Sequence, residues 1–428
     1  LIFTTKIFQK LIELQLKMQR KFLNNLVKVK TFLAFNLIIF IAKIFYSIHN
    51  NFSTNYFEDW SIANNLAKFG VYSEFMEVGS TAYKLPIYPL FLSSVIYFFP
   101  KNSTEIIIIL QHVLFFFIPI FFLLISKIFN AEKIGIVTAY FFIFSPAYFF
   151  YSNVIEATNV FVPIILIWFF FYLNIYKGIY KTNFQYVLFS IITALLFLTQ
   201  IVIVPLAVFL VLYLLVSKKI ILKNWIFIFT LALIFYSPWV IRNYIVFDKF
   251  IPTKTPVWQN IYLSYTPMVN VLDKVKLVSS KNEIKTFQMR KHISEFEMEK
   301  IYKKETLKVL KGKQEIVLLK MIQNTVLLWY VPSRFFYDNS FKIVFGRKIF
   351  VILLNIFTIS ALFILFKNNK KLFYLSIIVF INFTFPYAIG HAANTRFKLD
   401  FEWYQYFLVA YLFYYFYKKL TKTKKSDF

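Results

Sequence analysis

The run Thr31–Ile48, TFLAFNLIIFIAKIFYSI, decides the fold class of this chain, and the residues after it point to its chemistry. The run is apolar over a length that can cross a bilayer as one helix. It is followed by Tyr56-Phe-Glu-Asp-Trp-Ser-Ile-Ala63 and then by Ser80-Thr-Ala-Tyr-Lys-Leu-Pro-Ile-Tyr-Pro89. An acidic pair beside a membrane span is costly unless it faces water or a partner. These two segments are therefore the first place to look for a functional site.

The whole composition agrees with the membrane character of that first run. Of the 428 residues, 59% are hydrophobic, only 20 are acidic, and the mean hydropathy is +0.63. Repeated apolar runs of this kind predict an all-α polytopic membrane protein. The chain has no cysteine. Structural disulfides, thiolate metal sites and a cysteine nucleophile are thereby excluded.

The strong positive charge is explained by membrane topology rather than by nucleic-acid binding. The formal net charge is +28, and 42 of the 48 basic residues are lysine. The lysines gather at the ends of apolar runs, as cytoplasmic flanks of membrane spans do. Because arginine is scarce, Arg242, Arg334 and Arg396 stand out, since a guanidinium offers a planar fork for phosphate or carboxylate.

Ten apolar runs are predicted to be transmembrane helices. After Thr31–Ile48 they are Glu105–Ile128, Lys133–Tyr151, Ala157–Tyr176, Phe184–Leu198, Ile201–Val216, Leu222–Ser237, Lys348–Phe366, Leu372–Tyr387 and Glu402–Tyr417. One further run, Ile87–Phe99, is short and has Pro86 and Pro89 at its front. If it crossed, the later lysine clusters would face outward, against the positive-inside rule. We therefore expect a surface-lying or re-entrant helix on the outer face.

This topology divides the chain into segments. Residues 1–30 form a basic cytoplasmic N-terminal segment, followed by an anchor rather than a cleaved signal peptide. Residues 31–237 form a transmembrane catalytic domain with its first outer loop at 49–104. Residues 238–347 form an extracytoplasmic loop with helical segments, and 348–417 form the C-terminal transmembrane helices. Residues 418–428 form a cytoplasmic tail.

Three acidic residues are the candidate catalytic groups. Ser61–Ala67 reads as a short helix, which places Glu58 and Asp59 at its start, where the helix dipole stabilises carboxylates. Glu156 is the only charged residue in a short connection predicted on the same outer face. Carboxylates that share a site can act as a base and as an orienter of a substrate hydroxyl. The alternative is that each is a solvated acid at a helix or span end.

Three basic residues are the candidate contacts for a substrate anion. Lys84 lies just before the expected surface helix, Arg242 follows a predicted span, and Arg396 lies in the last outer loop. Each could face a phosphate, and each could instead be an interfacial anchor whose charged end reaches water. His49, His112 and His292 show no metal-ligand spacing. The sequence therefore requires no cofactor. A divalent metal between the carboxylates is neither required nor excluded by the residues present.

Taken in order, these motifs resemble those of the GT-C glycosyltransferases. The nearest group is family 39, the protein-mannosyltransferase-like enzymes that include bacterial lipid A aminoarabinose transferases. The matching stretches are Glu58-Asp59 with Ala63-Asn-Asn-Leu66, Ser80-Thr-Ala82 with Leu85-Pro-Ile-Tyr-Pro89, Ser145-Pro146 with Tyr151-Ser152 and Glu156, Ser237-Pro-Trp-Val-Ile-Arg-Asn243 with Phe247-Asp-Lys-Phe-Ile-Pro252, and His391 with Arg396-Phe-Lys-Leu-Asp-Phe-Glu402. The chain departs from the family pattern at Leu85, Gln200 and Asp400, where a proline, an arginine and a proline are usual.

The resemblance implies an inverting transfer of a sugar from a polyprenyl-phosphate donor to an extracytoplasmic lipid, glycan or protein. It implies that Asp59, with Glu58 beside it, deprotonates the acceptor hydroxyl, and that Lys84, Arg242 and Arg396 stabilise the leaving phosphate. It also adds Tyr88 and His391 as substrate-binding residues. It places the protein in a bacterial inner or plasma membrane, as part of cell-envelope synthesis.

Two other classes of function remain open from the sequence. A transporter or lipid flippase would use discontinuous spans and charges inside the membrane, whereas the charged groups here lie in predicted outer loops. A non-catalytic membrane scaffold would use the long loop at 238–347 to bind partners.

The topology can be tested by reporter fusions. A reporter fused after Ser53 should be extracytoplasmic and one fused after Asn369 should be cytoplasmic, because every lysine cluster then lies inside. The opposite pair of results would make Ile87–Phe99 a true span and would remove Glu156 from the face that carries Glu58 and Asp59.

Overall fold

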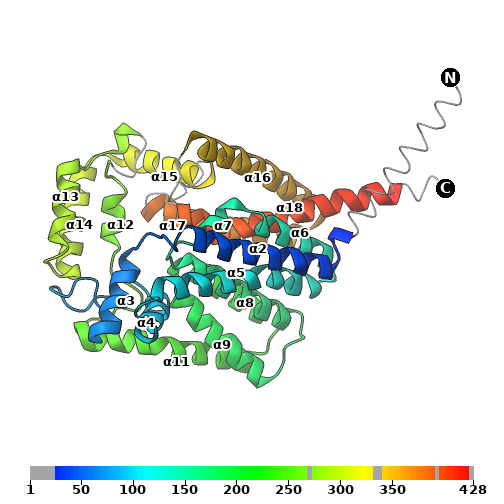
Figure 1. Cartoon of the computed structure of the whole chain (residues 1–428), viewed down its shortest axis with the longest axis horizontal. Coiled ribbons are helices and arrows are strands. Elements are labelled where there is room, and N and C mark those ends of the chain that lie inside the picture. Colours follow the sequence, from blue (N-terminus) through cyan, green and yellow to red (C-terminus); the bar gives the residue numbers. More distant parts are fainter. Residues whose placement is uncertain (1–24, 268–271, 331–339, 391–394, 424–428) are drawn as a thin grey trace, which may run out of the picture.

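The structure, a computed structural model, describes residues 25–267, 272–330, 340–390 and 395–423. Over these ranges the regular elements are α-helices and two short 3-10 turns, with no β-strand (Figure 1). The predicted all-α fold is confirmed over the described residues. Figure 1 shows most of the helices running side by side, with the first turn of α2 and the last turns of α18 at one end of the molecule.

Within the described residues, six helices are long and apolar enough to cross a membrane. They are α2 (Val29–His49), α5 (Ser103–Lys127), α8 (Thr158–Tyr176), α11 (Leu222–Phe247), Val344–Asn368 of α16 (Phe341–Asn368), and α17 (Lys370–Gly390). Six of the ten predicted spans thus have helices of sufficient length and apolarity. The predicted count of about ten is not confirmed, because the remaining four runs differ from simple spanning helices.

The run Lys133–Tyr151 is not one helix. It folds as α6 (Glu132–Ile143) and α7 (Pro146–Tyr151), with a break at Phe144 and Ser145. The Ser145 side chain accepts a hydrogen bond from the backbone N–H of Tyr148, and Pro146 occupies the first turn, where its missing N–H costs nothing. At 1.5 Å per residue, α6 is about 18 Å long, which is short of the roughly 30 Å hydrocarbon core. The prediction of a continuous helix here is wrong.

Three further runs also differ from the expected spans. The helices α9 (Asn183–Phe197) and α10 (Val204–Val216) are apolar but short. The helix α18 (Thr395–Thr423) is long, yet it is not among the six. Its first turns contain several charged residues and its middle several tyrosines, which lower its mean hydropathy. Residues 397–410 of α18 are almost entirely buried, so α18 is a central packing element of the bundle.

Two helices extend beyond the expected bounds. The run Leu222–Ser237 continues through Pro238 as α11 and ends at Phe247, where Asp248 takes a left-handed conformation with φ of 50°. The loop predicted from residue 238 therefore starts at Asp248. The helix α16 begins at Phe341, before the expected Lys348.

The long segment after α11 folds into a helical lobe, defined here as residues 258–267 and 272–310. It contains α12 (Trp258–Leu263), α13 (Ser280–Met289) and α14 (Glu295–Leu310), packed on a small core that includes Tyr262, Met298 and Tyr302. Helix α15 (Gln314–Trp329) then leads back toward α17, so the apolar stretch around Thr325 is helical up to Trp329. In Figure 1 the lobe lies beside α3 (Glu58–Phe69), at the end opposite the last turns of α18.

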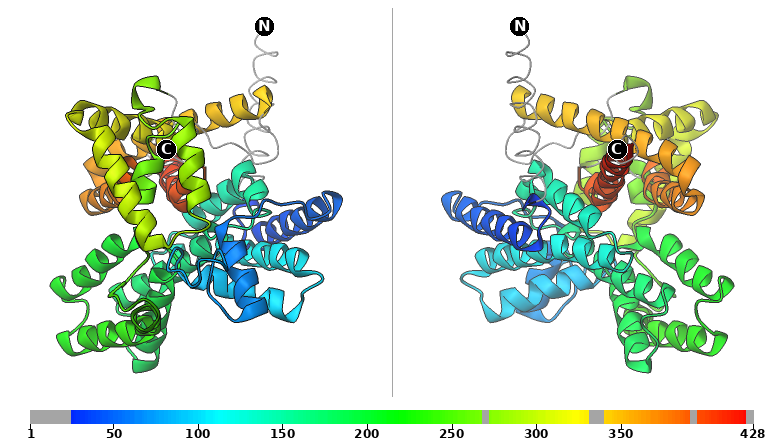
Figure 2. Two further views of the ribbon diagram at one scale, coloured as in Figure 1. Left: turned by 90° about the vertical axis from the view of Figure 1, so that its left-hand side faces the viewer. Right: turned by 90° about the vertical axis from the view of Figure 1, so that its right-hand side faces the viewer.

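The short helix α4 (Ile87–Phe98) joins α3 to the main bundle. It packs against α3 and α5 through Tyr88, Leu92 and Ile96, and it exposes Tyr97 and Phe98. Viewed end-on in Figure 2, α2–α5, α9–α11 and the helices from α15 onward lie on three different sides of the molecule. The large apolar core between them includes Trp168, Phe161 and Tyr148.

The closest helix contact in this core predicts a stability effect. A Cβ at Gly135 of α6 would lie 2.6 Å from the backbone oxygen of Phe122 in α5 and would also clash with Ser126. Gly135→Ala should therefore force the two helices apart and lower the free energy of unfolding by about 1–3 kcal/mol. Thermal unfolding in detergent measures this.

The matched control is Gly346→Ala in α16, where no atom lies within 4 Å of the added methyl group. Because alanine is the better helix former, this variant should unfold at the wild-type temperature or slightly higher. Equal behaviour of the two variants would contradict the close α5–α6 contact.

Candidate functional site

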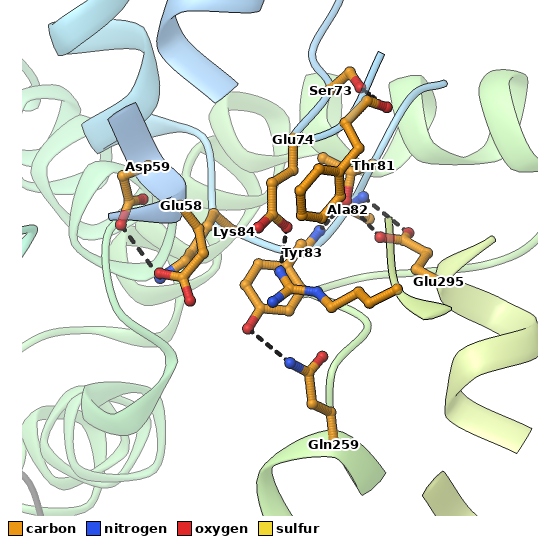
Figure 3. Close-up of polar contacts among 12 residues, drawn as sticks. Glu58, Asp59, Ser73, Glu74, Thr81, Ala82, Tyr83, Lys84, Gln259 and Glu295 are labelled. Atoms are coloured by element: carbon orange, nitrogen blue, oxygen red, sulfur yellow. Dashed lines mark hydrogen bonds and ion pairs between the residues drawn. The ribbon is translucent and has the colours of Figure 1, made fainter. Parts of the chain in front are cut away.

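Helix α3 places the acidic pair in its first turn, beside Lys84. The ammonium of Lys84 lies 3.4 Å from Glu58 Oε2 and 3.3 Å from Asp59 Oδ2, as Figure 3 shows. Asp59 is 3% exposed, while Glu58 is about one-third exposed at its side chain. One lysine thus bridges two carboxylates, one of them buried.

Lys84 and Glu58 stabilise each other in their ionised forms. Burial alone would lower the pKa of Lys84, but the carboxylates of Asp59 and Glu58 more than offset this and raise it above its ordinary value. The positive charge of Lys84 lowers the pKa of Glu58 to about 2, despite its burial. At neutral pH both groups therefore carry their charge.

A second ion pair brings the C-terminal helix to the same site. Arg396, in the first turn of α18, lies 2.6 Å from Glu156 Oε2, which stands between α7 and α8. The charge of Arg396 also lowers the pKa of Glu58 and opposes the ionisation of Lys84. The two ion pairs are therefore electrostatic neighbours, and the structure gathers five of the eight predicted site residues from distant parts of the chain.

Tyr88 supports this cluster from α4. Its hydroxyl donates to Gln111 Oε1 at 2.9 Å, and the Gln111 amide donates to the backbone oxygens of Ser152 and Val154, just before Glu156. Burial, together with the negative charges of Asp59 and Glu156, raises the pKa of Tyr88 well above its ordinary value. Tyr88 thus remains a neutral hydroxyl between the two acidic parts of the site.

Arg242 has a different place from the one expected. Its guanidinium donates to the backbone oxygen of Thr81 at 2.8 Å and lies over the rings of Tyr72, Trp239 and Phe247. In the described part of the chain it makes no ion pair with the predicted carboxylates. Arg242 therefore holds the loop that carries Lys84.

His391 and Arg334 fall outside the described residues. Among the residues that the structure describes, no group of three or more His, Asp or Glu side chains is arranged to hold a metal ion.

The helical lobe holds the loop before Lys84 in place. The sequence did not predict this contact between the lobe and the loop. Glu295 of α14 accepts hydrogen bonds from the Thr81 hydroxyl and from the backbone N–H of Ala82 at 2.9 Å. Arg290 forms an ion pair with Glu74 and stacks over the ring of Tyr83 at 4.1 Å. Figure 3 shows Glu74, Tyr83 and Glu295 gathered on the lobe side of Lys84. The scarcity of arginine was a signal that could have singled out Arg290.

A further lysine coupled to the site also escaped sequence reasoning. Lys254 follows α11 in the connection to the lobe, and the neighbouring Thr255 N–H donates to the Ala82 carbonyl at 3.2 Å, two residues before Lys84. Burial, and then the charges of Lys84 and Arg396, lower the pKa of Lys254 to about 8. Nothing in the sequence distinguishes it from the many other lysines of this chain.

No protein-family model matches the chain, and no curated protein is significantly similar to it. The resemblance to GT-C glycosyltransferases therefore stays a prediction from the motifs.

The Lys84 pair predicts a pH dependence of stability. Because the pKa of Glu58 is lower in the folded chain than its ordinary 4.5, ionised Glu58 stabilises the fold above pH 4.5, and this is lost as the pH falls toward 2. Glu58→Gln should thus be less stable than wild type at pH 6, by about 1 kcal/mol or less because the side chain is partly exposed.

Thermal unfolding between pH 6 and pH 3 tests this. The wild-type advantage should shrink as the pH falls. A difference that stays constant over this range would mean that the Glu58 carboxylate is not stabilised by Lys84.

Proposed function

We propose that this chain is an integral-membrane inverting glycosyltransferase that moves a sugar from a polyprenyl-phosphate donor to an acceptor hydroxyl outside the cytoplasm. The observation that carries the proposal is the convergence of two carboxylate–cation pairs, Lys84 with Glu58 and Asp59, and Arg396 with Glu156. Carboxylates and cations held side by side suit a reaction that removes a proton while a phosphate leaves.

Asp59 is the proposed general base. It is fixed at the start of α3 and held by Lys84 at 3.3 Å, so its orientation is set before a substrate arrives. An acceptor hydroxyl would give its proton to Asp59 as its oxygen attacks the anomeric carbon. Glu58, being more exposed, is placed to orient the acceptor.

Lys84 and Arg396 are the proposed stabilisers of the leaving phosphate. The bond from the anomeric carbon to the phosphate oxygen breaks as the new glycosidic bond forms, and negative charge grows on the phosphate. Both cations are at least three-quarters buried, where ion contacts are stronger than in bulk water. No covalent enzyme intermediate is needed, which is why inversion is expected.

The placement of the charged site favours an enzyme over a conduit. The cluster formed by residues 58, 59, 84, 156 and 396 lies outside the six helices that could cross a membrane. A transporter would be expected to place such groups on broken helices near the middle of the bilayer. Here they lie on helix ends and connections, where a lipid-linked donor and a water-soluble acceptor could meet.

Asp59→Asn tests the proposed reaction. The variant keeps the shape of the side chain but cannot accept the proton, so sugar transfer should fall by about 10²–10⁴-fold while the protein is still made. Intact-lipid mass spectrometry of glycolipids from a deletion strain carrying the variant measures the product.

The control is Glu77→Gln, in the connection between α3 and α4. The Glu77 side chain is suitable because it is 74% exposed. It should transfer sugar like wild type. If Asp59→Asn restores the glycolipids as well as wild type does, Asp59 is not the base, and a flippase or scaffold becomes the better reading of the chain.

A further inference from the structure

Helix α15 has buried polar side chains and exposed apolar side chains. After its first turn, the exposed positions of the helix are Leu318, Ile322 and Val326. Residues at intervals of four lie on one face of a helix, so these three form one apolar stripe. Leu318 is 60% exposed, whereas Lys320 is 1% exposed and Asn324 is also buried. A surface helix of a water-soluble protein has the opposite arrangement, with its apolar stripe toward the core.

The buried polar side chains of α15 are hydrogen-bonded to the end of α17 and to the lobe. The Lys320 ammonium donates to the Ser264 hydroxyl at 3.2 Å and to the Ile389 carbonyl. The Asn324 amide donates to the Tyr387 carbonyl at 3.4 Å. An ammonium at the carboxyl end of a helix is stabilised by the helix dipole. The polar face of α15 therefore has its partners inside the protein.

Helix α15 ends beside the middle of a helix that can cross a membrane. The Asn355 amide donates to the Trp329 carbonyl, and Asn355 lies near the centre of Val344–Asn368 in α16. The Trp329 indole donates to the Thr384 hydroxyl of α17 at 2.9 Å. The stretch from Leu318 to Trp329 rises by about 17 Å, which is about half of the roughly 30 Å hydrocarbon core. Helix α15 is therefore long enough to reach the middle of a bilayer but not to cross it.

The next helix starts on the side from which α15 comes. Helix α16 begins at Phe341, and Arg347 near this start forms an ion pair with Glu402 near the start of α18. At about 1.5 Å per residue, Phe341 lies about 21 Å from Asn355 along the helix axis. Helix α16 thus starts about 21 Å from the level at which α15 ends, on the side of the charged site. Entry and return on one side is the course of a re-entrant helix.

Helix α17 exposes a similar apolar stripe where it packs along α15 (Figure 1). Ile381, Phe385 and Ile389 are exposed in this stretch, again at intervals of four residues. Neither this stretch of α17 nor the part of α15 after its first turn exposes a charged side chain. Large uncharged apolar surfaces of this kind mark contact with a membrane or with a protein. Because α17 is itself apolar enough to cross a membrane, lipid is the partner that both stripes fit.

We infer that α15 is a re-entrant helix, which enters the bilayer from the side of the helical lobe, and that lipid acyl chains cover its apolar stripe. The segment predicted to be an extracytoplasmic loop, residues 238–347, therefore dips into the membrane at α15. This inference depends on the membrane character of the helices and not on the proposed reaction.

The inserted helix has a consequence for the candidate functional site. Helix α15 connects the lobe to α17, and Glu295 of the lobe accepts hydrogen bonds from the loop before Lys84. The insertion of α15 thus holds the lobe, and with it this loop, at a fixed height over the bilayer.

Single cysteines test the inference directly, because the chain has no cysteine of its own. Leu318→Cys, Ile322→Cys and Val326→Cys are labelled with a nitroxide in the full chain and reconstituted in phosphatidylcholine nanodiscs. Power-saturation electron paramagnetic resonance compares collisions with O₂, which concentrates in hydrocarbon, and with nickel ethylenediaminediacetate, which stays in water. All three labels should collide more with O₂, and the excess should grow from Leu318→Cys to Val326→Cys as the label lies deeper.

Two reference sites calibrate the collisions. Lys285→Cys replaces an exposed lysine of α13 and should collide more with the nickel complex. Ile359→Cys in α16, where the side chain is 66% exposed within a candidate span, should favour O₂. If the three labels on α15 behave like Lys285→Cys, the apolar stripe faces water and the inference is overturned. If they collide with neither reagent, protein covers the stripe, from this chain or from a second copy, and the inference is overturned as well.

A charge on the stripe supplies a second readout. Ile322→Asp would place a carboxylate in hydrocarbon, which is costly, so the variant should unfold several degrees below wild type in nanodiscs. The matched control is Ile284→Asp on the exposed surface of α13, which should unfold near the wild-type temperature. Equal unfolding temperatures for the two variants would contradict the insertion of α15.

Discussion

A charged side chain that is buried in an apolar helical protein requires a partner of opposite charge. The candidate functional site depends on this constraint. Lys84 is held by Glu58 and Asp59, Arg396 by Glu156, and Arg347 of α16 by both oxygens of Glu402 in α18 at 2.8 and 2.6 Å. Removing one partner of a fully buried pair such as Arg347–Glu402 typically costs about 3–5 kcal/mol, because the other charge is left uncompensated. These pairs therefore fix which helix ends and loops can lie together.

The pairs connect segments that are far apart along the chain. Arg396 and Glu156 join the last helix to the connection between α7 and α8, and the helical lobe reaches the loop of Lys84 through Glu295 and Arg290. Arg242 fixes the same loop from α11. The position of Lys84 is therefore set by three separate parts of the structure, which is the preorganisation that a catalytic electrostatic site needs.

Part of the fold and of the site could be read from local patterns. The start of α3 at Glu58 follows from a helical pattern over Ser61–Ala67, and the start of the short α4 follows from Pro86 and Pro89 at its front. The break at Ser145 was missed although Ser-Pro is a helix-start signal, because the apolar run around it looked continuous. The sequence predicts that this helix ends at Ser237, before Pro238, yet α11 continues through the proline to Phe247.

The sequence by itself determined the all-α, membrane-suited character of the chain and the residue types of its site, since apolar length and charge placement are local properties. Only the tertiary structure decided that Lys84 bridges both members of the acidic pair and that Arg396 meets Glu156. It also decided that Arg242 holds the loop that carries Lys84. These pairings depend on how helices from distant parts of the chain pack together. A local pattern of neighbouring residues does not specify that packing.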